Sequence, residues 1–481
     1  MPGTIFLTGL YTGVDWDSVI DKIMQVEQKR IDVLEDQKSV YKNKLSAWQD
    51  LNTKVLNVQT QAEALSRTDA FNIFTTTLSA SSGDPKSYVT ATAGSEATAG
   101  VYEFTIKQLA AAKMDKTTNA FSSMTDALNW NGVLQLRRTG ASEWTTITIE
   151  TSDSLEDIKD KLNQVTDDTG VIASIVKYAD NDYRLVLTAK DTGEANAFEI
   201  NNAATITVDS TTYDNLALPS YLGLFSSTDA SGNGANENII QQAQNAIINI
   251  YGQDAERSSN TVTDLIPGVT LNLLQADENV NVTLQVRRDT DAIVGNIQNF
   301  IEAVNDVLSY INKQSTYTEG KEAPILLGDT TMMRLRSDIT TTMRQYGFVD
   351  NDGNERYLFH IGIRLSDDNV YKINTSELTE AIENNFEMVV RLFTDEDTGI
   401  ANRMQKLVEN ITDPYSYGYM ESHKNEFESQ IENINNRIED IQDQMDKERD
   451  QLYQQFVTLE KYMAQMQQTQ QWLSQQLSKL Q

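Results

Sequence analysis

Residues 431–480 read IENINNRIEDIQDQMDKERDQLYQQFVTLEKYMAQMQQTQQWLSQQLSKL, and this stretch decides the fold of the C-terminal end. Large apolar residues recur in it at seven-residue intervals without a miss. They are Ile431, Ile438, Met445, Leu452, Leu459, Met466, Leu473 and Leu480. A seven-residue repeat sustained over this length is typical of a helix that packs in a coiled coil. The stretch therefore predicts a long helix whose apolar seam needs a partner.

A second apolar stripe, near the N-terminal end, predicts that partner. The six prolines leave residues 3–84 and 415–481 uninterrupted, and proline breaks helices, so both ends can hold long ones. Asp17 and Ser18 are suitable N-caps for the first helix. Its stripe follows at helical spacing, at Ile20, Met24, Ile31, Leu34, Tyr41, Leu45 and Trp48. We predict that these residues and the C-terminal seam from Ile431 to Met466 hold the two helices together.

The polar face of the final helix changes character along its length. Charged residues are dense from Glu421 to Asp450, whereas eleven of the last 31 residues are glutamine and only Glu460, Lys461 and Lys479 are charged. Two interpretations remain open. The glutamines either form a solvated face, or pack against another protein through their amide groups and aliphatic stems.

Strand patterns dominate the middle of the chain. Tyr102, Phe104 and Ile106 alternate with polar residues, which predicts a strand with one buried face. Ser154 and Asp157 resemble a capping box at the start of a short helix that ends at Gly170. The remaining pattern predicts strands at 171–177, 183–188, 246–251, 269–274 and 280–287, a hairpin at 357–373, and helices at 291–311, 328–346, 376–393 and 399–411.

This order of elements predicts an α+β multidomain protein in which long terminal helices pair as a coiled coil. A discontinuous helical domain and two inserted β-rich domains lie between them. The boundaries we predict are 1–40 with 415–481 for the coiled coil, 41–72 with 289–414 for the helical domain and its small hairpin, 73–118 with 236–288 for one β-rich domain, and 119–235 for the inserted β-rich module.

Composition excludes several classes of function. The 481 residues carry a net charge of −31, which argues against binding nucleic acid or anionic lipid. The chain has no cysteine and only two histidines, His360 and His423, so we expect no metal and no cofactor. It contains no phosphate-binding, metalloprotease or nucleophile-elbow motif, and we expect no enzyme.

No apolar run is long enough for a membrane span, and the N-terminus lacks the features of a cleaved secretory signal. Asp350–Glu355 lacks the full ligand set of a calcium loop, and we interpret it as a solvated turn.

Several stretches resemble one family, the flagellar filament cap proteins, also called hook-associated protein 2. Together they cover nearly the whole chain in the family's order. They are GLYTGVD (9–15) with Ile20, Met24 and Glu27, residues 41–52 with Ala47 and Trp48, AGVYEFTIKQLA (99–110), residues 154–193, RSSNTVTDLIPGVTL (257–271), IGI (361–363) and LF (392–393). The stretch 154–193 resembles a module shared by flagellins and cap proteins.

The resemblance implies a function. Family members are exported unfolded through the flagellar secretion channel, act outside the cell at the flagellum tip, and form a closed ring of copies beneath which flagellin folds and is inserted. The implied partners are a second copy of the chain, flagellin, the hook–filament junction proteins and an export chaperone. The chaperone would bind Leu473, Leu477 and Leu480; alternatively, this stripe only packs against residues 17–65. A surface adhesin that binds a host glycan or mucin through the module at 119–235 is the alternative function.

The sequence departs from the family pattern at three positions. Arg30 stands near a usual proline, so the first helix is expected to continue through it. Asn369 stands where a turn glycine is common, and asparagine tolerates the left-handed conformation that such a turn needs. Thr12 replaces a usual serine.

Overall fold

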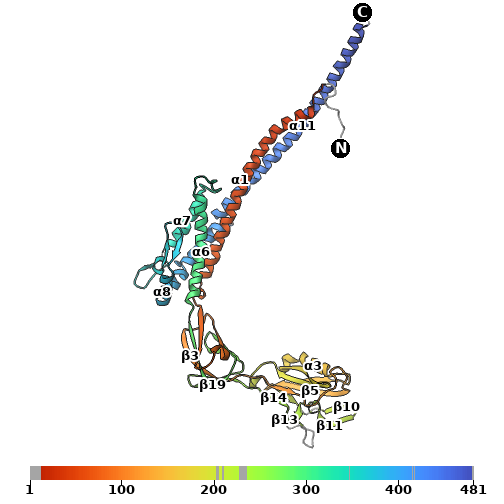
Figure 1. Cartoon of the computed structure of the whole chain (residues 1–481), viewed down its shortest axis with the longest axis vertical. Coiled ribbons are helices and arrows are strands. Elements are labelled where there is room, and N and C mark those ends of the chain that lie inside the picture. Colours follow the sequence, from red (N-terminus) through yellow and green to blue (C-terminus); the bar gives the residue numbers. More distant parts are fainter. Residues whose placement is uncertain are drawn as a thin grey trace. The chain divides into compact units, whose positions relative to one another are not determined.

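The computed structural model describes residues 12–201, 205–208, 211–226, 236–345, 347–413, 415 and 418–478. Contacts divide the chain into two compact units, Met1–Phe71 with Thr290–Gln481, and Asn72–Asp289. The first is mainly helical and the second is built from β-sheets (Figure 1). The predicted fold class is confirmed, with long terminal helices and a β-rich middle.

The longest elements of the first unit are the two terminal helices, α1 (Trp16–Leu65) and α11 (Tyr419–Ser478). They lie side by side (Figure 1). They run antiparallel, because Trp16 stacks on Phe456 near one end and Trp48 bonds to Met420 near the other. As expected, α1 continues through Arg30 without a break.

The cap of α1 differs from the prediction. Asp15, not Asp17 or Ser18, is the N-cap, and its carboxylate accepts a hydrogen bond from the Ser18 backbone N–H at 3.1 Å. The N-cap lies two residues before Asp17 and three before Ser18, so the two predicted caps lie inside the first turn of the helix.

The body of this unit forms where three further helices pack with α1 or with one another. They are α6 (Thr290–Ser315), α7 (Thr330–Arg344) and α10 (Ile400–Thr412). Their apolar faces and the apolar face of the second half of α1 are buried. The residues include Leu51, Val55, Val58, Phe300, Ile301, Val304, Leu308, Met404 and Val408. Burial of these side chains fixes one face of each helix toward a common core.

The continuous helix predicted at 376–393 is wrong. The structure has two helices, α8 (Thr375–Asn384) and α9 (Phe386–Thr394), separated by Asn385. Asn385 has φ −138° and ψ 44°, which is not helical, and its N–H caps α8 by bonding to the Ala381 carbonyl. Asparagine side chains favour helix ends over helix interiors, which explains why the apolar pattern continues through a break.

Short elements complete the first unit. They are η1 (Thr68–Ala70), β20 (Phe348–Val349), β21 (Glu355–Arg356), η3 (Leu358–Ile361), β22 (Ile363–Leu365) and β23 (Tyr371–Ile373). The predicted hairpin at 357–373 is the pair β22–β23, preceded by the 3₁₀ turn η3. Its turn contains Asn369 with φ 57°, so asparagine supports the left-handed conformation as expected.

In the second unit, one core lies between two antiparallel sheets. The larger has the order β1 (Phe74–Ala80), β19 (Asp277–Arg288), β3 (Gly100–Gln108), β15 (Ala246–Ile250) and β16 (Gln253–Arg257). The smaller has the order β17 (Thr261–Ile266), β18 (Val269–Leu273) and β2 (Val89–Ala93), with α2 (Pro85–Tyr88) beside it. Phe104 and Ile106 are buried here, in agreement with the predicted alternation.

The turn between β17 and β18 requires glycine. Gly268 has φ +72°, and a Cβ atom there would lie 2.3 Å from the Ala97 backbone nitrogen. No side chain fits at that distance, so the turn packs directly on the backbone at residue 97.

The second core of this unit belongs to the inserted module. One sheet has the order β11 (Thr211–Ala217), β10 (Thr205–Val208), β5 (Trp130–Arg138) and β6 (Thr145–Ile149), with β9 (Phe198–Asn201) also paired to β5. The other has the order β14 (Ile239–Gln241), β4 (Met114–Lys116), β8 (Asp182–Ala189) and β7 (Val171–Ala179). The remaining elements are α3 (Leu155–Gln164), α4 (Thr166–Thr169), η2 (Glu194–Asn196), α5 (Leu218–Leu222), β12 (Phe225–Ser226) and β13 (Asn236–Glu237). The capping box of Ser154 and Asp157 is confirmed at the start of α3.

The sheet β14-β4-β8-β7 extends beyond the range predicted for the module. Strands β4 and β14 lie on either side of 119–235 in sequence, yet they pair with each other, and β4 also pairs with β8. The predicted boundaries at 118/119 and 235/236 therefore leave β4 and β14 outside the module, although both strands belong to one of its sheets. The full four-part division remains a prediction.

Candidate functional site on the terminal helices

The middle of the α1–α11 pair is held by a small apolar cluster. Ile31 and Leu34 from α1 meet Ile434 and Ile438 from α11, and all four are between 4% and 7% exposed. Tyr41, Ile441 and Met445 pack against this cluster and are partly buried. The structure thus brings together five of the predicted seam residues, Ile31, Leu34, Tyr41, Ile438 and Met445. Ile434 and Ile441, each three residues after a seam residue of α11, join them.

The start of α11 is fixed by polar contacts around Trp48. The Trp48 indole N–H donates to the Met420 carbonyl at 2.9 Å, and the side chain is 1% exposed. His423 contacts the edge of this indole and lies 2.7 Å from the Asp329 carboxylate through Nε2. Asp329 also caps α7 by accepting from the N–H groups of residues 331 and 332. One histidine therefore links the two helices to a third.

The opposite end of the pair is fixed by residues that the stripe analysis missed. The Trp16 ring stacks on Phe456, with ring centroids 4.2 Å apart. The Trp16 indole N–H donates to the Glu460 carboxylate at 2.8 Å, and the Thr12 hydroxyl bonds to the same oxygen. Glu460 is only 9% exposed. A buried carboxylate is tolerated because these donors satisfy it.

No sequence spacing signals this contact, because Trp16 and Glu460 are separated by 444 positions. The available signals are weaker. Glu460 is one of very few charges in the last part of the chain, and Thr12 and Trp16 lie in or beside the stretch 9–15 that resembles the cap family. Thr12, which replaces a usual serine, still supplies a hydroxyl.

Other seam residues differ in burial. Ile20 is buried, and Met24, Leu45, Ile431 and Leu452 are partly buried. Leu459 and Met466 lie outside the contact between the two helices, with 39% and 67% exposure. The reason is the length of α1, whose first residue already lies beside Phe456, so that the described part of α1 offers no surface farther along α11.

An exposed apolar stripe consequently follows the end of the helix pair. Its members lie between residues 459 and 477 and are 39–67% exposed. They are Leu459, Tyr462, Met466, Leu473 and Leu477. Trp472 is also exposed but lies off this stripe, because adjacent residues of a helix point to different faces. Leu480 lies outside the described residues. An apolar face of this size on a single helix is a surface for binding another chain.

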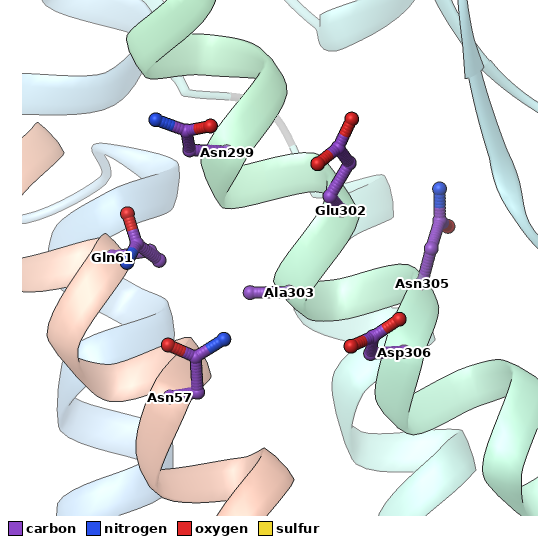
Figure 2. A pocket seen from close by; sticks show the side chains of 7 residues that line it. All are labelled: Asn57, Gln61, Asn299, Glu302, Ala303, Asn305 and Asp306. Carbon is purple, nitrogen blue, oxygen red and sulfur yellow. The ribbon is translucent and has the colours of Figure 1, made fainter.

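Polar side chains among the described residues gather in a groove of the first unit. A groove of about 370 Å³ between α1 and α6 is lined by amides and carboxylates, among them Asn57, Gln61, Glu302 and Asp306 (Figure 2). Within the described part of the chain, no three histidine, aspartate or glutamate side chains are placed to hold a metal ion. No helix among the described residues combines the length and apolar composition that a bilayer crossing requires.

Asp350 is engaged by its own turn. Its carboxylate accepts from the N–H groups of residues 352 and 354 at 3.0 and 2.8 Å and from the Arg356 guanidinium. The Asn354 backbone hydrogen bond is the main cause that lowers the pKa of Asp350 to about 2. This geometry agrees with the interpretation of 350–355 as a turn.

Comparisons with known proteins assign the family. The family described as flagellar hook-associated protein 2 matches through its C-terminal region at residues 243–468 and through its N-terminal region at residues 12–113. Together these matches cover more than half of the chain. The chain belongs to the flagellar hook-associated protein 2 family. The flagellin hook IN motif also matches, at residues 136–191, which include α3, β7 and β8.

Relatives of flagellar hook-associated protein 2 align along the whole chain. The A-type protein of Pseudomonas aeruginosa is 27% identical over 100% of this chain and 98% of its own length. The Salmonella typhimurium protein is 27% identical over 98% of this chain and 97% of its own. The crystal structure of the flagellar cap protein FliD D1-D2-D3 domains from Escherichia coli aligns with TM-score 0.62 and 24% identity, over 79% of this chain and 99% of that one.

Membership of the hook-associated protein 2 family assigns the chain to the cap at the tip of the flagellar filament. This is a structural role, and nothing in the family or the geometry shows catalytic activity. None of these relatives is described as an adhesin, so the comparisons add no support to that alternative.

Proposed function

We propose that copies of this chain form a closed ring at the filament tip, beneath which exported flagellin folds and is inserted. The observation that carries this proposal is the exposed stripe of α11 between residues 459 and 477. In a family of filament cap proteins, an apolar helix that extends beyond its intrachain partner suits a contact with another subunit. In a ring built from head-to-tail contacts, each copy binds one neighbour through one surface and the other neighbour through a second surface.

The glutamine-rich face of α11 suits contact with flagellin or with the hook–filament junction proteins. Gln468 and Gln475 are exposed, and few fixed charges accompany them. An uncharged side-chain amide both donates and accepts hydrogen bonds, so it can pair with many partners in a contact that breaks and forms again. Gln468→Glu with Gln475→Glu should impair filament growth while ring assembly in vitro stays normal. Normal filaments from this variant would refute the role of this face.

The same stripe is proposed to bind an export chaperone before assembly. Leu473 and Leu477 are 49% and 65% exposed, four residues apart on one helical face, as ligands of a hydrophobic groove are. Deletion of residues 465–481 should abolish chaperone binding in a pull-down, while Lys461→Ala serves as a nearby control. Unchanged binding by the deletion variant would refute this proposal. Export through the flagellar channel agrees with a chain that has no cysteine to form cross-links.

The test of the capping function is the fate of flagellin in a strain that lacks this chain. Culture medium is separated from cells, and flagellin is assayed as monomer in the medium or as filament on the cell. Abundant secreted monomer, reversed by restoring the chain, is the expected result. Normal filaments with loss of surface attachment would instead support the adhesin.

A further inference from the structure

An open pocket of about 320 Å³ lies in the first unit, at the C-terminal end of α7. Its walls come from the last residues of α7, the turn η3 and the hairpin β22–β23. Buried Met343, Leu358 and Ile363 form its apolar part. None of the surfaces discussed above includes it. This volume is at the lower end of the range of natural ligand sites.

A buried phenol lines this pocket without a hydrogen-bond partner. Tyr371 is 4% exposed, and its hydroxyl contacts no acceptor or donor among the described residues. The backbone around it is fixed, because Asn305 of α6 accepts from the Tyr371 N–H at 2.7 Å and donates to its carbonyl at 2.8 Å. Burial raises the pKa of Tyr371 to about 12, so the group is an O–H donor at neutral pH. A buried donor without an acceptor is costly, and a bound acceptor would remove that cost.

A guanidinium without a carboxylate partner lines the same pocket. Arg344, the last residue of α7, is exposed and has no ion pair among the described residues. Arg364, also in the lining, is by contrast paired with Glu377 at 2.7 Å. Arg344 and Tyr371 line the same pocket, and the positive charge of Arg344 opposes the rise in the pKa of Tyr371. Among the described residues that line the pocket, Arg344 is a cation without an ion pair and Tyr371 is a donor without an acceptor, and both suit an anion.

The rim of the pocket is apolar and exposed. Phe359 is 51% exposed and stacks on the Tyr357 ring, with centroids 5.5 Å apart, and Leu365 is 37% exposed. A bare inorganic anion would gain nothing from these side chains. A ligand with an apolar body and a carboxylate would bury the rim and pair with Arg344. It would reach the buried Tyr371 hydroxyl by displacing the side chains that cover it.

We propose that this pocket binds a carboxylate carried on a bulky apolar group, with Arg344 and the Tyr371 hydroxyl holding the carboxylate. Such a group has two sources, a free organic acid or an acidic residue beside an apolar one in a second copy of this chain. The proposal does not rest on the capping function, because it follows from the pocket alone.

The probe is 3-phenylpropionate, titrated into the full chain by isothermal calorimetry, and its matched control is the neutral 3-phenylpropionamide. The acid should bind, and the amide should bind about tenfold or more weakly, because it cannot form the charged contact. Arg344→Gln should weaken binding of the acid by about tenfold, whereas Arg336→Gln, on the same helix but outside the lining, should leave it unchanged.

Tyr371→Phe distinguishes an effect on ligand binding from an effect on folding. The substitution removes a hydroxyl that has no partner among the described residues, so the melting temperature should stay the same or rise, while acid binding falls by about fivefold. Absence of acid binding at millimolar concentration, equal binding of acid and amide, or no effect of either Arg344→Gln or Tyr371→Phe would overturn the proposal.

Sedimentation velocity then identifies the source. If a second copy supplies the carboxylate, both 3-phenylpropionate and Arg344→Gln shift the wild-type assembly toward monomer. If assembly is unchanged while the probe binds, the natural ligand is a free organic acid. Both results agree with carboxylate binding in the pocket. Only the calorimetric titrations can overturn that proposal.

Discussion

The α1–α11 contact should weaken measurably when one side chain is removed from its apolar cluster. Ile434→Ala deletes three carbon atoms from a side chain that is 5% exposed and faces Ile31 and Leu34. At about 0.8 kcal/mol per buried methylene, the loss of buried apolar surface alone lowers the stability of the contact by about 2.4 kcal/mol. The cavity left behind raises the loss to about 4 kcal/mol at most, because two helices can partly close around it.

Hydrogen exchange is the assay that isolates this contact. The chain has two compact units, so a global melting curve reports more than one transition. Amide exchange in residues 427–445 instead reports local separation of α11 from α1. A loss of 2.4–4 kcal/mol corresponds to about 50- to 700-fold faster exchange.

Met466→Ala is the matched control on the same helix. This side chain is 67% exposed and lies beyond the end of the helix pair, so exchange in residues 427–445 should change less than about threefold. Alanine favours helix formation by a few tenths of a kcal/mol in both variants, which cannot mask the effect. Exchange of Ile434→Ala within about threefold of wild type, or an equal effect of Met466→Ala, would refute the reasoning.

Three further predictions concern polar contacts. Glu460→Ala should cost about 1.5–3 kcal/mol at the end of the helix pair, since Trp16 loses a charged acceptor, and amide exchange should quicken at the start of α1 but not near Ile434. The Asp350 carboxyl has a pKa lowered from 3.8 to about 2, so its stabilisation of the β20–β21 turn is complete above about pH 4 and is lost as pH falls through about 2; a carboxyl titration by NMR checks this. Lys113→Met should destabilise the inserted module by about 3–5 kcal/mol, because it removes the cation 3.3 Å from fully buried Asp115. Adding Asp115→Leu should recover most of that loss in urea unfolding, and failure to recover it would contradict the pairing.

The terminal helices were predictable because their information is local and repeated. Each apolar residue of the C-terminal stripe signals the same face, so the helix can be recognised without any knowledge of its partner. The strands around Phe104 and the capping box at Ser154 are local in the same sense. Asn385 shows the limit, because one non-helical residue splits a helix without changing the apolar period on either side.

Long-range contacts were not predictable in this way. Nothing near Trp16 indicates a carboxylate 444 positions away, and nothing near Tyr371 indicates that its phenol is buried beside the last residue of α7. Both depend on where distant elements end. A single sequence without homologues carries no signal for contacts between distant residues, whereas it carries a strong signal for an apolar stripe that repeats along a helix.

Where α1 begins determines which part of the C-terminal seam remains available. A heptad stripe uses the same kind of residue within a chain and between chains, so Leu459, Met466 and Leu473 do not differ in chemistry from Ile438. They differ because the described α1 begins at Trp16, beside Phe456, and the Glu460 carboxylate bonds to Trp16 and Thr12 there. Beyond that point the apolar seam continues, but no charged residues lie beside it, because Lys461 is the last charged residue of the described helix. An apolar seam without charged neighbours discriminates little between partners by charge, which suits the two partners proposed above for this stripe, a second copy of the chain and an export chaperone.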